Sequence, residues 1–137
     1  MTYRLAEDML AALTKTANGL DYEAHMALIS PTVRVFGVPG FAVIGYDDWA
    51  RQCRHEFAGK LLKSVRYEGL DIVSCTPGHV LFKTREIIEG TDGTVNDHGL
   101  EILIQQEADG LWRITQERLL SPEEVHFDRH RSSDGPP

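Results

Sequence analysis

The sequence predicts an α+β fold, in which three helices precede and pack on a strongly curved, mostly antiparallel sheet. Two observations carry this prediction. Apolar residues recur at helical spacing in residues 3–18 and 47–62. From His79 to Leu120 apolar residues instead alternate along three long runs, which are separated by GTDG and ADG, and such breaks are typical of hairpin turns. Helices and long strands are therefore segregated along the chain.

The first half of the chain contains the predicted helices. The first spans residues 3–18 and ends at Asn18-Gly19, because both residues tolerate the left-handed conformation that terminates helices. The second begins after Asp21, a favourable N-cap, and runs to about Ile29. Ser30-Pro31 then interrupts it, since the residue before proline avoids the helical conformation.

Strands and a third helix follow. Thr32 to Val38 is rich in β-branched residues and predicts a strand, and after a turn Phe41 to Ile44 could return as a short strand. The third helix is expected from about Asp47 to Leu62. Its apolar stripe has a four-residue spacing and comprises Trp49, Cys53, Phe57 and Leu61. Residues 64–75 predict the strand that leads into the three long ones.

Length and charge limit the classes of function. A chain of 137 residues is one domain, which we expect over residues 1–122, with a polar and flexible tail over 123–137 that frays beyond about Phe127. The net charge of −7 argues against nucleic acid and against an anionic membrane as partners. The N-terminus lacks a secretory signal pattern, so we expect a cytoplasmic protein with two free thiols, Cys53 and Cys75.

The segment DGLWRITQERLLSP, residues 109–122, resembles the last hairpin of the nuclear transport factor 2-like (NTF2-like) superfamily. It is most similar to the SnoaL-like and ketosteroid-isomerase-like branches, and also to the association domain of calcium/calmodulin-dependent kinases. Gly19 with Asp21, and Gly45 ahead of the third helix, fit the same pattern. The resemblance implies a cone-shaped, cystatin-like fold, in which a bent sheet wraps a long helix and encloses a pocket. It also implies a homodimer through the outer sheet face.

The resemblance names several activities without selecting one. Members of the superfamily include isomerases, dehydratases, cyclases and proteins without a known reaction. Ketosteroid isomerases carry an aspartate base two residues beyond a valine on the first strand. Here Val33 is followed at that spacing by Val35, so this base is absent. We expect no cofactor and no metal ion, because His126 and His130 in the tail are too few to form a metal site.

The turns predict which residues share a face of the sheet. We expect GTDG to form a two-residue loop and ADG a three-residue loop with Gly110 in the left-handed position. A two-residue ADG loop would instead turn Gln116 and Arg118 inward. With the three-residue loop, Leu81, Lys83, Arg85 and His98 lie on the outer face. The same outer face would contain the predicted dimer contacts Leu100, Ile102, Ile104, Trp112, Ile114, Gln116 and Arg118.

The inner face would then hold two facing carboxylates, Glu101 and Glu117. At a separation of ~5 Å, their repulsion would raise the pKa of one by roughly 2 units, giving a general acid beside a general base. Alternatively these acids neutralise helix cations such as Arg51 or Arg54. The remaining predicted pocket-lining residues are Val35, Trp49, Phe57, Phe82, Thr84, Glu86, Asp97, Leu103, Thr115 and Leu119.

Two functions follow from these expectations. The first is a SnoaL-like protein that binds a neutral or cationic organic molecule in the pocket and acts as a cofactor-independent isomerase, dehydratase or cyclase. The second is a non-catalytic, dimeric association or scaffolding module, in which the apolar outer face carries the function. The two differ in whether inward polar residues converge at the bottom of a cavity.

Overall fold

The computed structural model describes residues 2–125 and confirms the α+β class. The predicted fraying beyond Phe127 and the tail histidines His126 and His130 lie outside these residues. In chain order the elements are α1 (Thr2–Asn18), α2 (Tyr22–Met26), β1 (Ile29–Phe36), α3 (Tyr46–Ala58), β2 (Leu62–Thr76), β3 (His79–Gly90), β4 (Val95–Gln106) and β5 (Trp112–Leu119).

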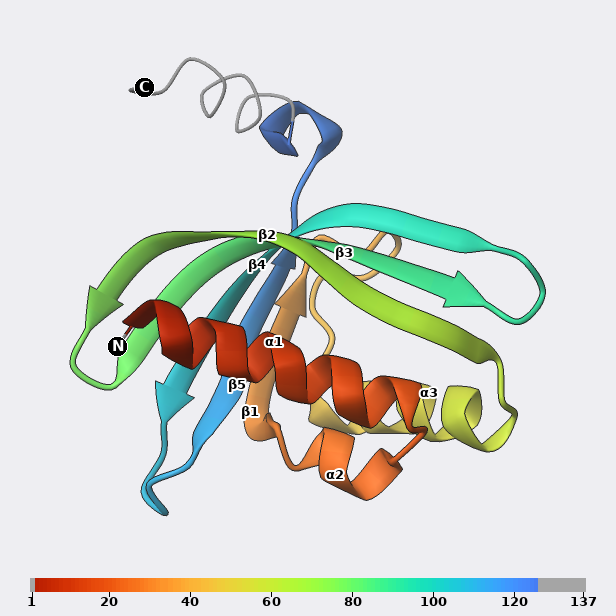
Figure 1. Ribbon diagram of the computed structural model, residues 1–137, viewed down its shortest axis with the longest axis horizontal. Coiled ribbons are helices and arrows are strands. Elements are labelled where there is room, and N and C mark those ends of the chain that lie inside the picture. Colours follow the sequence, from red (N-terminus) through yellow and green to blue (C-terminus); the bar gives the residue numbers. More distant parts are fainter. Residues whose placement is uncertain (1, 126–137) are drawn as a thin grey trace.

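The strands form one five-stranded sheet in the order β1-β5-β4-β3-β2. Strands β2 to β5 pair antiparallel, whereas β1 pairs parallel with β5, so the sheet is mixed at one edge. Figure 1 shows the sheet arching over α1, with α2 and α3 beneath it. Wrapping a twisted sheet around one long helix buries the apolar face of each against the other.

The helices form where the sequence predicts them, but two of them end early. The second was expected to run to about Ile29, whereas α2 ends at Met26 and Ile29 begins β1. Asp21 caps α2 by accepting a hydrogen bond from the Ala24 amide at 3.2 Å. The expected end of α3 at Leu62 is wrong, because the helix stops at Ala58. Lys60 has a φ of 52°, a left-handed conformation that cannot continue a right-handed helix. Leu61 is consequently 45% exposed rather than part of the buried stripe.

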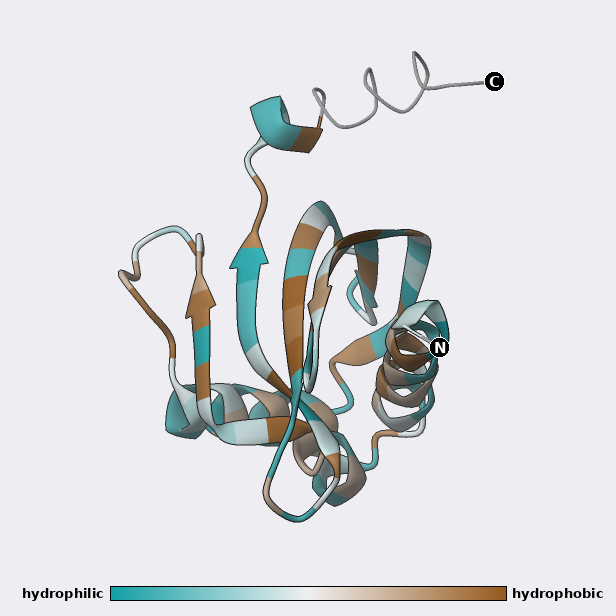
Figure 2. Ribbon diagram, turned by 90° about the vertical axis from the view of Figure 1, so that its left-hand side faces the viewer, coloured by the Kyte–Doolittle hydropathy of each residue, from teal (hydrophilic) through white to brown (hydrophobic). Residues whose placement is uncertain are grey.

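The core lies between α1 and the concave face of the sheet. Figure 2 shows hydrophobic residues recurring along the central strands and on α1, which is seen nearly end-on. The sheet contributes the fully buried side chains Val80, Phe82, Leu100, Ile102, Ile104 and Ile114, and the helix contributes Ala6, Met9, Leu10 and Leu13. A smaller cluster of Ala17, Phe57 and Val65 joins the far end of α1 to α3 and β2.

The predicted two-residue GTDG loop is wrong. Glu89 pairs with Val95, and Gly90 donates to the Thr94 carbonyl at 2.8 Å, so three residues form the turn. Gly93 has a φ of 90° and takes the left-handed position that such loops require. One extra loop residue reverses which face of β4 points inward, because side chains alternate along a strand.

The three-residue ADG loop is confirmed. Gly110 has a φ of 84°, and Glu107 donates to the Leu111 carbonyl across the turn at 2.9 Å. Beyond the turn, however, the register shifts between Ile104, which pairs with Ile114, and Leu103, which pairs with Gln116. Thr115 is thus the extra residue of a bulge, and the bulge brings Glu117 opposite Ile102.

These two register changes overturn the predicted faces of β4 and of β5 ahead of the bulge, whereas the predicted faces of β3 and the inward position of Glu117 are as expected. Of the predicted dimer contacts, Leu100, Ile102, Ile104 and Ile114 are each 0% exposed within one chain, so they form the core and not a subunit surface. On β4, Leu103 and Glu101 lie on the outer face instead of lining the pocket. Asp97 is exposed and pairs with Arg85.

Gly37, at the end of β1, provides a sharp test of the close packing between β1 and β5. Its φ is 87°, and a Cβ there would lie 2.7 Å from the Leu119 carbonyl oxygen. Gly40 has nearly the same φ, 88°, with no atom within 4 Å of its Cβ position. We expect Gly37→Ala to lose more stability than Gly40→Ala, which should cost only the backbone strain of about 1–3 kcal/mol. Urea unfolding of both variants checks this, and equal losses would contradict the close approach.

Candidate functional site

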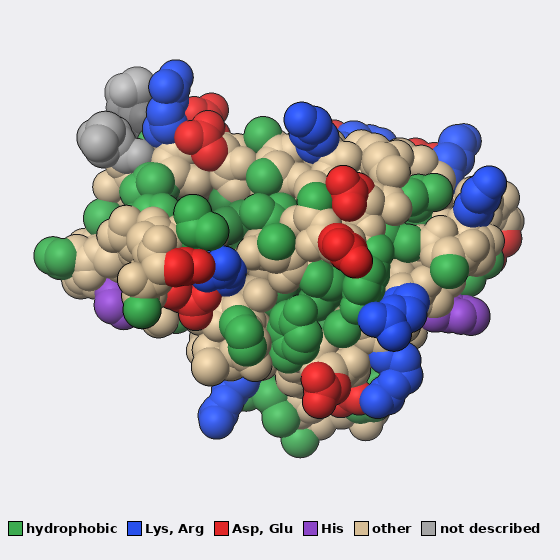
Figure 3. Space-filling view, turned by 90° about the horizontal axis from the view of Figure 1, so that it is seen from below, with side chains coloured by type: hydrophobic (Ala, Val, Ile, Leu, Met, Phe, Trp, Pro, Cys, Tyr) green, Lys and Arg blue, Asp and Glu red, His purple; other side chains and the backbone are tan. Residues whose placement is uncertain are grey.

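A pocket of about 490 Å³ lies between α3, β1, β5 and the loop that joins β1 to α3. Its wall is mostly apolar. Val35, Cys53 and Glu117 are only 7%, 7% and 8% exposed, so they form the base of the pocket, while Phe41 is 62% exposed and lies at the mouth. Figure 3 shows the molecule from the side that carries α2 and α3, where hydrophobic side chains gather at the centre with charged ones around them.

Glu117 is the one strongly buried charged residue of this base. Strand β5 places it between Val35 on one neighbouring strand and Ile102 on the other. In the part of the chain that the structure describes, no hydrogen bond or ion pair satisfies its carboxyl. Burial raises the pKa of Glu117 well above its usual range, and the negative charge of Glu86 raises it further. Both effects favour the protonated, uncharged form of the carboxyl.

Glu86 is the centre of a hydrogen-bonded row that crosses three strands. Tyr67 on β2 donates its hydroxyl hydrogen to Glu86 Oε2 at 2.8 Å, and His98 Nε2 on β4 lies 2.9 Å from Glu86 Oε1. The three residues are direct neighbours in the register of β2, β3 and β4. Burial, followed by the charges of Glu86 and Glu117, raises the pKa of Tyr67 well above its usual range. This row holds a negative charge near Glu117.

His25 is a buried histidine on α2. It is 8% exposed, its Nδ1 lies 2.8 Å from Thr16 Oγ1, and its ring packs against Phe57 at 5.4 Å between centroids. Burial lowers the pKa of His25, although the charge of Glu86 opposes this. The imidazole is therefore neutral at pH 7 and joins α1, α2 and α3 as a packing residue.

Cys53 faces the pocket from α3 but is not a nucleophile. Burial raises the pKa of its thiol to about 12, with Glu56 and Glu117 adding to the shift against a hydrogen bond from Trp49. Since the thiolate is the reactive form, this cysteine is unreactive near neutral pH. Cys53 supplies a small neutral surface beside Glu117.

The predicted site residues are only partly brought together. Val35 and Trp49 lie on the pocket wall with Glu117. Phe82 and Leu119 pack in or against the main core, and Phe57 packs in the smaller cluster. Thr84 donates to the Gly69 carbonyl at 2.6 Å, while Thr115 occupies the bulge.

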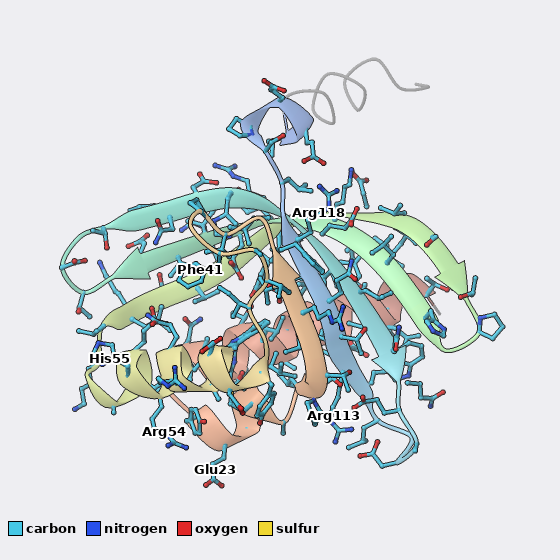
Figure 4. The ribbon with its side chains drawn as sticks, turned by 180° about the vertical axis from the view of Figure 1, so that it is seen from behind. Glu23, Phe41, Arg54, His55, Arg113 and Arg118 are labelled. Carbon is cyan, nitrogen blue, oxygen red and sulfur yellow. The ribbon has the colours of Figure 1, made fainter. Side chains whose placement is uncertain are left out.

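The predicted pair of facing glutamates is not present. Glu101 lies across the sheet from Arg118, not from Glu117, and its carboxylate is within 3.3 Å of the Arg118 guanidinium. Arg118 also pairs with Glu124 at 2.8 Å. Figure 4 shows Arg118 close to the start of the C-terminal segment. Glu86 is the acid that interacts with Glu117 instead.

Sequence reasoning missed Tyr67 and His98 as members of the inner cluster. His98 was placed on the outer face because of the GTDG loop length. If GTDG is instead taken as part of a three-residue loop, the pairing of β3 with β4 puts His98 beside Glu86. Tyr67 is followed by Gly69, where the register of β2 shifts, so its partner could not be read from strand alternation alone.

Two classes of feature are not found among residues 2–125. No cluster of three or more His, Cys, Asp and Glu side chains there has an arrangement that could hold a metal ion. No helix in the same range is both long and apolar enough to cross a membrane.

Comparison with known proteins places the fold. No family model matches the chain, and no curated protein is similar to it in sequence. Solved structures do match. An NTF2-like protein from Cytophaga hutchinsonii has a TM-score of 0.70 at 13% identity, over 86% of this chain and 96% of that one. The protein therefore has the NTF2-like fold.

Two further similar structures carry names that suggest chemistry, and both come from Novosphingobium aromaticivorans. A proposed scytalone dehydratase matches with a TM-score of 0.61 at 17% identity, over 85% of this chain and 80% of that one. A proposed aromatic ring hydroxylase matches with a TM-score of 0.67 at 14% identity, over 88% of this chain and 90% of that one. Because these names differ while the fold is shared, the fold alone does not select a reaction.

Proposed function

We propose that this protein binds a small organic molecule in the α3–β1–β5 pocket and catalyses proton transfer through Glu117, as a cofactor-independent lyase or isomerase. One observation carries the proposal: Glu117 is 8% exposed, lines the pocket base and has no partner among the described residues. No side-chain oxygen or nitrogen that is sealed from solvent lacks a hydrogen-bond partner in residues 2–125, so the carboxyl of Glu117 is open to the pocket space, where it can serve a ligand.

The electrostatic surroundings suit a general acid. The Glu86 charge, held by Tyr67 and His98, disfavours ionisation of Glu117. A carboxyl that keeps its proton at pH 7 can protonate a leaving hydroxyl or a carbonyl oxygen, and the carboxylate that results can remove a proton from carbon. Both half-steps belong to elimination of water and to isomerisation.

Proton transfer can be tested without knowing the natural substrate. The protein is incubated in D₂O with a panel of small uncharged β-hydroxy ketones and enones, and mass spectrometry follows water loss and deuterium uptake at carbon. We expect turnover that falls by about 10²–10⁴-fold in Glu117→Gln, the usual contribution of a general acid or base. Glu101→Gln, on the outer face, is the matched control and should keep the activity. Equal turnover in Glu117→Gln and the natural protein would contradict the proposal.

The alternative function, a non-catalytic association module, loses its main support. It was based on an apolar outer face, and the four aliphatic side chains that defined this face are buried inside the chain. The outer face around Glu101, Arg118 and Glu124 is occupied by ion pairs instead. A homodimer through Trp112 and Gln116, which are half-buried, stays a proposal that sedimentation analysis can test.

A further inference from the structure

The face of α3 that lines the pocket is aromatic at one end and acidic at the other. Trp49, Gln52, Cys53 and Glu56 follow the spacing i, i+3, i+4 and i+7, so they form one stripe along the helix. The stripe begins with an aromatic ring and ends with a carboxylate. A ligand lying along it would meet an apolar surface at one end and a negative charge at the other.

The charges on the pocket wall are predominantly negative. Asp48 and Glu56 contribute carboxylates and Glu117 a carboxyl whose charged form is disfavoured, while Arg51 is the only lysine or arginine among the described residues of the wall. Arg51 is paired with Asp48 at 3.1 Å, and their side chains are 77% and 63% exposed, so this pair belongs to the rim. An anionic ligand reaching the base would therefore meet carboxyls without a compensating cation.

Glu56 is the wall acid best placed to hold a cation. It is half-buried, and its carboxylate has no ion pair in the described part of the chain. Cys53 and Glu56 are three residues apart on the face of α3 that lines the pocket, so the Glu56 carboxylate lies near the surface that Cys53 provides. The space beside Cys53 thus has a negative potential, and it is bordered by the aromatic ring of Trp49, whose face attracts cations.

We propose that the pocket is selective for an organic cation, a quaternary or protonated amine on an apolar body of about one ring. The positive charge lies beside Cys53 and pairs with Glu56, while the apolar body contacts Trp49, Val35 and Ile44. This inference rests on the proposed function for the pocket itself and adds the class of molecule that the pocket accepts. Glu117 remains free to transfer a proton, because Glu56 carries the pairing with the ligand.

The test compares three probes of similar shape: phenyltrimethylammonium, its uncharged isostere tert-butylbenzene, and the anion benzoate. The permanent charge of the first probe avoids any change in its ionisation on binding. Ligand-observed NMR at matched concentrations measures the dissociation constants for the natural protein, Glu56→Gln and Glu23→Gln. Glu23 is the matched control, since it is an exposed acid on α2 that points away from the body in Figure 4.

We expect the cation to bind at least about tenfold more tightly than the uncharged isostere, and benzoate to bind most weakly. Glu56→Gln should remove this preference by weakening the cation about tenfold while leaving the isostere unchanged, and Glu23→Gln should change neither. Equal affinity for cation and isostere, or an unchanged preference in Glu56→Gln, would overturn the proposal. The proposed function fails by a different result, namely proton transfer that survives Glu117→Gln.

Discussion

Replacing Glu117 with glutamine is expected to stabilise the protein increasingly as the pH rises. Glutamine has nearly the same shape as a protonated glutamate but cannot ionise. In the natural protein the folded-state pKa of Glu117 is raised above the ordinary value of 4.5. The folded state then binds more protons than the unfolded state, so natural stability is lost as the pH rises from about 4.5 through the folded-state pKa.

The expected size follows from the linkage relation. One proton difference changes the free energy of unfolding by about 1.4 kcal/mol per pH unit within this window. Urea unfolding of the natural protein and Glu117→Gln at pH 5, 6, 7 and 8 measures the difference, in which the contributions of the other titrating groups largely cancel. Parallel pH profiles for the two proteins would contradict a raised pKa at Glu117.

Glu101→Gln serves as the matched comparison for the same experiment. Glu101 lies on the opposite face of the sheet and pairs with the Arg118 guanidinium at 3.3 Å. Removing its charge takes away an ion pair at the surface, which contributes at most about 1 kcal/mol. This variant should therefore lose a little stability or none, and it should not gain stability with rising pH.

Truncation of Ile102 to alanine is expected to destabilise the protein by about 2–5 kcal/mol, because it leaves a cavity in a packed core. Ile102 is 0% exposed and lies between Phe82 and Glu117 on the neighbouring strands. Leu103→Ala is the control, since Leu103 is the next residue, has the same number of carbon atoms and points to the half-buried outer face. We expect its loss to be less than half as large.

This pair of variants decides the register of β4. If Leu103→Ala cost as much as or more than Ile102→Ala, the inward face would be the one that a two-residue GTDG loop predicts. Denaturant unfolding with a shared slope against urea concentration gives both values on the same scale.

Much of the fold could be predicted because its signals are local. The apolar spacing of residues 3–18, the Asp21 cap and the alternation from His79 onward each depend on a few neighbouring residues. The parallel pairing of β1 with β5 has no such signal. It joins segments some eighty residues apart, and only packing in three dimensions determines it.

The site was harder to predict because side chains alternate between the two faces of a strand, so one extra residue in a loop or bulge reverses which of them face inward. Glu117 was correctly expected to face inward, but for a reason that involved two errors. The GTDG loop is one residue longer than expected, which reverses β4, and the bulge at Thr115 reverses the alternation again before Glu117. Glu101 and His98 lie on β4 between these two changes, so both were assigned to the wrong face.

The acid that raises the pKa of Glu117 could not be identified from the sequence for the same reason. Glu86 was expected to line the pocket, yet its bonds to Tyr67 and His98 depend on the registers of three strands. Burial of a carboxyl is also a property of the whole molecule. Nothing in the residues next to Glu117 indicates that α3 and β1 shield its side chain from solvent at the base of the pocket.

The central claim is that Glu117 is a protonated carboxylic acid at neutral pH. Infrared spectroscopy measures this directly, because a protonated carboxyl has a carbonyl stretch separate from those of carboxylates and amides. At pH 7 we predict one such band in the natural protein, shifted in D₂O and absent from Glu117→Gln, while Glu101→Gln retains it. The absence of a protonated carboxyl band at pH 7, or its persistence in Glu117→Gln, would contradict the assignment of Glu117 as the acid of this site.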